Sequence, residues 1–138
     1  MDRALNYLGL ARKGGMAELG EEAVGGAARA HKAYAILVAA DASDHIWRRA
    51  LSFAEGTEQQ VLRVNYTKAQ LGQAAGRETL AIAAVTDVQM ALALVKALEG
   101  SPWTEKALEV LTVKAAKAKK RQAEARAHKR NVRMGKKK

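Results

Sequence analysis

The chain has 138 residues, enough for one domain with an extension, and 49% of them are apolar, so it can bury a substantial core. It has no cysteine, which excludes a disulfide framework and a cysteine-based metal site, and its three histidines lack ligand-like spacing. No apolar stretch approaches the length of a membrane span and no secretion signal is apparent, so we expect a soluble, cytoplasmic protein with no membrane partner, cofactor or metal.

The net charge is distributed unevenly along the chain. Residues 1–100 contain 11 basic and 11 acidic side chains, whereas residues 101–138 contain 13 basic and 3 acidic ones. The whole excess of +10 therefore lies in the last quarter. This asymmetry predicts a neutral globular domain over residues 1–100 and a basic extension over residues 101–138 that suits a polyanion.

A first helix is predicted from Arg3 to about Ala11, because Asp2 can cap it and the Gly14-Gly15 pair can end it. Its inner stripe would consist of Leu5, Leu8 and Leu10.

The stretch from residue 12 to residue 41 is the centre of the predicted fold. It opens with a basic, glycine-rich loop containing Arg12 and Lys13, followed by a weak strand over residues 16–19. Gly20 then breaks the chain before a second helix, whose acidic first turn suits the positive end of the helix dipole. Residues 34–40 are uncharged and predict a strand buried on both faces. A helix N-terminus beside basic residues is a natural position for a phosphate group.

The Gly25-Gly26 pair lies inside this second helix, where each glycine costs about 1 kcal/mol relative to alanine. We favour close packing against a neighbouring element as the reason. Close approach of a ligand is the alternative.

The second half of the chain continues the alternation. Ser43 can cap a third helix that runs to about Phe53, and a short strand follows over residues 61–64. Thr67 can cap a fourth helix that ends at Ala75, with Gly76 as its C-cap. After the strands at residues 34–40 and 61–64, another strong strand is predicted over residues 80–85. Thr86 can cap a fifth helix over residues 87–99, whose stripe would be Val88, Leu92, Val95 and Leu98, before a boundary at Gly100-Ser101-Pro102.

This order of elements predicts an α/β fold. Four strands and five helices in about 100 residues indicate a three-layer α-β-α sandwich with a four-stranded mixed sheet.

The extension begins with a short apolar stripe that can dock on the domain, formed by Trp103, Ala107, Leu108 and Leu111. From Lys114 onward the chain is mostly alanine, lysine and arginine with no apolar face, so we expect a helical or disordered tail that orders on binding. A solubilising arm is one interpretation. We favour nucleic-acid binding, through Lys117, Lys119, Lys120 and Arg121.

Motifs for nucleotide binding and catalysis are absent from the sequence. It contains no Walker sequence, and its glycines do not match the dinucleotide-binding spacing. Asp41, Ser43, Asp44 and His45 form a polar cluster, but they flank a helix start, where Asp and Ser serve as caps. We therefore expect a protein that is not an enzyme.

Five blocks carry a resemblance to a known family: Leu-Gly-Leu-Ala-Arg-Lys-Gly-Gly (8–15), Gly-Glu-Glu-Ala-Val (20–24), Ile-Leu-Val-Ala-Ala-Asp-Ala-Ser (36–43), Leu-Gly-Gln-Ala-Ala-Gly-Arg-Glu (71–78) and Ala-Ile-Ala-Ala-Val-Thr-Asp (81–87). In this order they resemble the bacterial YlxQ proteins, a branch of the superfamily of kink-turn-binding ribosomal proteins. The resemblance covers about residues 3–95 and leaves the extension outside it.

The resemblance implies an α-β-α sandwich that binds RNA without catalysis, through two regions. Carried over to this chain, the first region is Gly20, Glu21, Glu22, Ala23 and Gly26, and the second is Arg77, Glu78, Thr79 and Leu80. The best-known binders place Asn, Glu and Lys where this chain has Glu22, Ala23 and Gly26. The missing cation could be supplied by Arg12, Lys13, Arg29, Lys32 or Arg77, or by the basic tail.

Two functions follow as expectations. The first is recognition of structured, kink-turn-like RNA in the ribosome or its assembly, or in association with translation factors, with the tail adding salt-sensitive affinity. The alternative is a protein-interaction module whose basic tail adds non-specific attraction.

Overall fold

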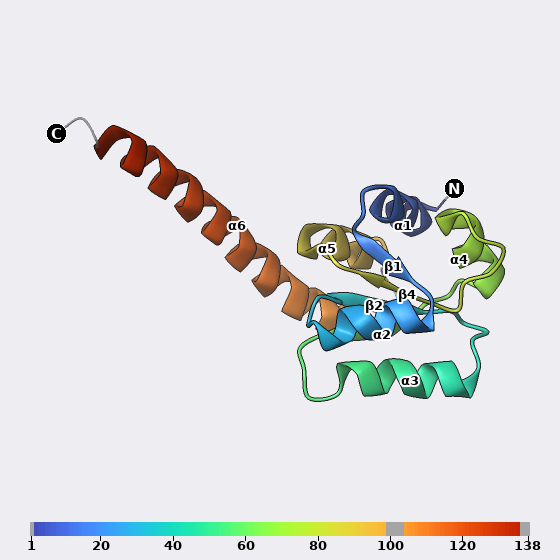
Figure 1. Ribbon diagram of the computed structural model, residues 1–138. Coiled ribbons are helices and arrows are strands. Elements are labelled where there is room, and N and C mark those ends of the chain that lie inside the picture. Colours follow the sequence, from blue (N-terminus) through green and yellow to red (C-terminus); the bar gives the residue numbers. More distant parts are fainter. Residues whose placement is uncertain (1, 99–103, 136–138) are drawn as a thin grey trace.

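A computed structural model describes residues 2–98 and 104–135 of the chain (Figure 1). The elements follow the predicted order: α1 (Arg3–Lys13), β1 (Ala17–Leu19), α2 (Glu21–Arg29), β2 (Ala35–Val38), α3 (Asp44–Ala54), β3 (Gln60–Arg63), α4 (Lys68–Ala75), β4 (Ile82–Val85), α5 (Val88–Lys96) and α6 (Thr104–Gly135). Trp103, the predicted boundary at Gly100-Ser101-Pro102 and the predicted helix end at Glu99 lie outside the described residues.

The four strands form one mixed sheet in the order β1-β4-β2-β3. β4 is antiparallel to both of its neighbours, whereas β2 and β3 are parallel. In Figure 1, α2 and α3 lie below the sheet, while α1, α4 and α5 lie above it. The predicted α/β sandwich with a four-stranded mixed sheet is confirmed.

The centre of the core is the pair β2 and β4, in which every residue is buried. Their uncharged, largely aliphatic sequences suit strands that are covered on both faces. The largest side chains around them that are almost fully buried include Leu8, Val24, Leu62, Leu71 and Leu94, drawn from five different elements.

Local capping residues fix most of the helix ends. The Asp2 carboxylate accepts a 2.8 Å hydrogen bond from the Ala4 N–H, and the Ser43 hydroxyl accepts one from the Ile46 N–H. Thr67 forms a capping box with Gln70, and Gly76 ends α4 with a φ of 76°. The sequence prediction named the wrong cap only for α5, where Asp87 and not Thr86 accepts from the Met90 N–H. The Thr86 N–H instead donates to the Met16 carbonyl, which extends the strand pairing by one residue.

Other details also differ from the prediction. Leu10 is 53% exposed, because the buried face of α1 follows Ala4, Leu8 and Ala11 at spacings of four and three. β4 begins at Ile82 instead of residue 80. α5 covers Val88–Lys96, which is shorter than the predicted range of residues 87–99. The buried stripe of α5 runs through Val88, Ala91, Leu94 and Val95, whereas Leu92 and Leu98 are only half-buried.

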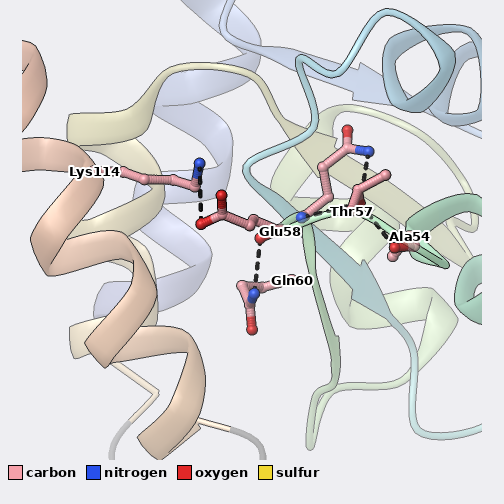
Figure 2. A network of polar contacts seen from close by, with 6 residues as sticks. Ala54, Thr57, Glu58, Gln60 and Lys114 are labelled. Carbon is pink, nitrogen blue, oxygen red and sulfur yellow. Dashed lines mark hydrogen bonds and ion pairs between the residues drawn. The ribbon is translucent and has the colours of Figure 1, made fainter.

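Over Thr104–Gly135 the basic extension forms one continuous helix, α6, of 32 residues, about 48 Å long at 1.5 Å per residue. Its first turns dock on the domain as expected, because Ala107, Leu111 and Ala115 are buried in the same core. Polar contacts also hold this segment. Gln89 Nε2 donates to the Ala115 carbonyl. Lys114 Nζ lies 3.7 Å from the Glu58 carboxylate, an ion pair drawn in Figure 2. Beyond Lys119, which still borders the domain, the helix stands away from it (Figure 1). In the described part of the chain, no helix combines the length and the apolar character that crossing a membrane requires.

Candidate functional site

The N-terminus of α2 begins at a glycine in an unusual conformation. Gly20 has φ 95° and ψ 161°, a region that side-chain-bearing residues rarely adopt, and its N–H donates to the Ile82 carbonyl at 3.0 Å. Glycine has no side chain that could cap the helix, and no side-chain capping bond is present. The first turn of α2 therefore presents backbone N–H donors and the positive end of its dipole.

The loop between α4 and β4 brings a cation onto this helix start. Arg77 Nη1 lies 3.6 Å from the position that a Cβ on Gly20 would occupy. Two backbone bonds hold the loop, from the Arg77 N–H to the Gly72 carbonyl at 2.7 Å and from the Leu80 N–H to the Lys68 carbonyl at 2.9 Å. The structure thus joins the two regions that the family resemblance implied.

A second guanidinium lies on the same loop. Arg12, in the last turn of α1, places its Nη1 atom 3.3 Å from the position of a Cβ on Gly76. Gly76 immediately precedes Arg77, so Arg12 and Arg77 occupy neighbouring positions although α1 and α4 are far apart in sequence. We call Arg12, Gly20, Gly76 and Arg77 the Gly20 surface.

Arg29 extends the positive charge along α2. Its Nη1 and Nη2 atoms lie 3.3 Å and 4.0 Å from the Cβ positions of Gly25 and Gly26. The side chain therefore points back toward the helix N-terminus, which is the usual direction in an α-helix. Lys32 lies beyond the C-cap of α2, at the opposite end of the helix from Gly20.

The two glycines inside α2 differ in their surroundings. A Cβ on Gly25 would lie 3.0 Å from the ring of Phe53, so this glycine allows α2 and α3 to pack closely, as predicted. Gly26 is exposed, and a Cβ there would meet only the tip of Arg29.

The acidic first turn of α2 is partly neutralised by α3. The Glu21 carboxylate accepts a 2.8 Å hydrogen bond from Arg49 Nε and lies 3.4 Å from His45 Nε2. The Arg49 guanidinium also lies over the Phe53 ring, with its Cζ atom 4.8 Å from the ring centroid. Glu21 is therefore committed to the contact between α2 and α3. Glu22 is exposed, and Ala23 is half-buried beside it.

The remaining predicted residues fall into three groups. Lys13 is exposed at the end of α1, and Glu78 and Thr79 are exposed in the loop between α4 and β4. Leu80 is 3% exposed, so its side chain packs in the core and only its backbone is near the loop surface. Four residues lie on α6, which leaves the domain at the opposite end of Figure 1 from the start of α2: Lys117, Lys119, Lys120 and Arg121.

Sequence reasoning gave Gly72 no role, although it supports the whole loop. A Cβ there would lie 2.8 Å from the carbonyl oxygens of Arg77 and Glu78 and from the Thr79 Cα. A single glycine inside a helical pattern often marks close backbone approach or packing, and this was the available signal.

The polar cluster after β2 has structural roles. The Asp41 carboxylate accepts from the Lys68 N–H at 2.8 Å, Ser43 caps α3, and Asp44 lies in its first turn. Among the described residues, no three acidic or histidine side chains are close enough together to hold a metal ion.

Comparison with known proteins identifies the fold and no more. No family model and no curated protein matches the chain. Among solved structures, it is similar to a protein with unknown function from Bacillus halodurans C, at 24% sequence identity and a TM-score of 0.66. The match covers 72% of this chain and 99% of that one.

Proposed function

We propose that this protein binds structured RNA without catalysis, in the cytoplasm, as a component of the ribosome or its assembly. The observation that carries the proposal is the position of Arg77 over Gly20 at the uncapped start of α2. Backbone N–H groups and guanidinium groups are the donors that bind phosphate oxygens. The resemblance of five sequence blocks to YlxQ proteins supports the same function.

The Gly20 surface favours recognition of RNA shape over recognition of a row of stacked bases. Arg12 and Arg77 on this surface, and Arg29 farther along α2, come from three separate segments and make no ion pair among the described residues, so their charges are available to phosphates. Glu22 can accept hydrogen bonds from the amino or imino groups of a base. A kink-turn, in which the backbone bends sharply, is the proposed target.

Binding of the full chain to a kink-turn RNA and to a straight duplex of equal length tests this proposal, at low and near-physiological salt. We expect a kink-turn preference that persists at the higher salt. Arg77→Gln should weaken kink-turn binding about tenfold, because a charged hydrogen bond contributes about 1.5–3 kcal/mol and 1.4 kcal/mol is a factor of ten. Arg48→Gln removes an equal charge from the outer face of α3 and is the matched control. Equal affinity for both RNAs would contradict shape recognition.

One observation favours the alternative of a protein-interaction module. A groove of about 830 Å³ lies between α3, β3 and the start of α6, and Leu51, which lines it, is 45% exposed. Binding to a purified translation factor that survives ribonuclease but is lost in Leu51→Glu would support this alternative. Complete loss on ribonuclease treatment would oppose it.

A further inference from the structure

A second cationic groove lies away from the Gly20 surface, where α6 passes α5 and α1. It has a volume of about 440 Å³ and is bounded by three helices. Arg3 and Tyr7 line it from α1, Gln89 and Lys96 from α5, and Lys119 from α6. Three basic side chains from separate segments thus converge on one groove.

The charge of this groove is not compensated by the protein. Arg3, Lys96 and Lys119 make no ion pair among the described residues, and no carboxylate of the described chain lines the groove. Asp2 is adjacent to Arg3 in sequence, but its carboxylate accepts from the Ala4 N–H and from the Tyr66 hydroxyl, and it lines a different cavity. Uncompensated cations in a recess attract anions more strongly than isolated surface lysines do.

The positive charge continues from the groove along α6. Starting at Lys119, steps of three or four residues place Gln122, Arg126 and Lys129 on the same helix face, and all of them are exposed. A linear polyanion that enters the groove can therefore follow the exposed helix. A small anion would use only the groove itself.

The groove and the Gly20 surface are distinct sites. Arg3 and Arg12 lie nine residues apart in α1, which corresponds to about 13 Å along the helix axis. Arg12 belongs to the Gly20 surface, whereas Arg3 lines the groove. α1 therefore acts as a spacer between the two.

We propose that this groove binds the sugar-phosphate backbone of a second RNA segment, so that one protein molecule holds two parts of an RNA. Arg3, Lys96 and Lys119 contact successive phosphates, and Tyr7 lies against a sugar or a base. This inference rests on the proposed function for the identity of the polyanion. The groove would be a second RNA-binding site, one that distinguishes neither the shape nor the sequence of the RNA.

The test uses the full chain and the same two RNAs, the kink-turn and the straight duplex. The groove variant combines Arg3→Gln, Lys96→Gln and Lys119→Gln. The matched control combines Arg48→Gln, Lys68→Gln and Lys106→Gln, which removes the same charge from outside both sites. A third variant, Arg12→Gln with Arg77→Gln, changes only the Gly20 surface.

Each phosphate contact contributes about 0.9 to the slope of log affinity against log salt concentration on duplex nucleic acid. The groove variant should therefore reduce that slope by about 2 to 3 on both RNAs, relative to the matched control. RNA carrying 4-thiouridine should also cross-link to the peptide that contains Tyr7. A slope equal to that of the control, together with no cross-link at Tyr7, would overturn the groove proposal.

The same experiment separates this proposal from the proposed function. If the Arg12 and Arg77 variant loses the kink-turn preference while the groove variant matches its control, shape recognition holds and the groove proposal fails. If wild-type protein shows no kink-turn preference but the groove variant still flattens the salt dependence on the duplex, the groove proposal holds and shape recognition fails. Absence of binding to either RNA at low salt would overturn both.

Discussion

Replacing Gly72 with alanine tests whether the loop that carries Arg77 is held in place by backbone packing. The added Cβ would lie 2.8 Å from two carbonyl oxygens and from the Thr79 Cα. These atoms belong to the backbone of the loop, which cannot yield as a flexible side chain does. Either α4 or the loop must move.

Two opposing contributions set the size of the effect. Alanine favours a helix interior over glycine by about 1 kcal/mol. Overpacking typically costs about 1–3 kcal/mol, and a clash with three backbone atoms belongs in the upper part of that range. We therefore expect Gly72→Ala to lower the free energy of unfolding by about 1–2 kcal/mol, or the melting temperature by about 4 °C per kcal/mol. The loop should also shift, and kink-turn affinity should fall.

Gly26→Ala is the matched control, because it makes the same change inside another helix. A Cβ there meets only the Nη2 atom of Arg29, at 4.0 Å. This variant should be more stable than the wild type by about 0.5–1 kcal/mol, through helix propensity alone. Urea denaturation of both variants measures the contrast. If Gly72→Ala proved as stabilising as Gly26→Ala, the packing explanation for the loop would be refuted.

Two further measurements check the packing of α6 and the ionisation of Tyr66. Leu111→Ala, at a position with 0% exposure, should lower the free energy of unfolding by about 2–5 kcal/mol. Val113→Ala, at 53% exposure, should change it by no more than about 0.5 kcal/mol. Equal urea midpoints for the two variants would show that α6 does not belong to the core. Burial and the hydrogen bond to Asp2 raise the pKa of Tyr66 from 10 to about 12. Because folding favours the protonated hydroxyl, this contribution to stability is present below pH 10 and is lost as pH rises toward 12. An ultraviolet titration should show a tyrosine transition near pH 12 that disappears in Tyr66→Phe. If Tyr66→Phe left the titration near pH 12 unchanged, the raised pKa of Tyr66 would be contradicted.

Features that depend on neighbouring residues could be predicted from the sequence. The caps at Asp2, Ser43 and Thr67 are local, since each side chain bonds to a backbone N–H two or three residues away. The fully buried strands β2 and β4 were also predictable, because an uncharged aliphatic stretch has no solvent face. The prediction of Thr86 as the cap of α5 was wrong because the next residue, Asp87, is an equally good capping residue. The Thr86 N–H bonds to the Met16 carbonyl and continues the strand pairing, so the helix begins after Asp87.

The geometry of the candidate sites could not be predicted in the same way. Arg77 and Gly20 are 57 residues apart, and no sequence period indicates that a guanidinium would lie over that glycine. The cationic groove draws Arg3, Lys96 and Lys119 from both ends of the chain. The family resemblance indicated the two regions around Gly20 and Arg77. It did not indicate that Arg29 lies over Gly25 and Gly26. It also did not indicate that Glu21 pairs with Arg49 of α3.

The order of the strands has a consequence for how the protein is made. β4 is the last strand in the sequence, yet it lies between β1 and β2 and is antiparallel to both. While the chain is being synthesised, β1 has no partner in the sheet until Val85 has emerged. Until then β2 can pair only with β3, and its apolar edge stays open to other chains. Contacts between such distant segments form slowly, so productive folding of the nascent protein waits for its fourth strand.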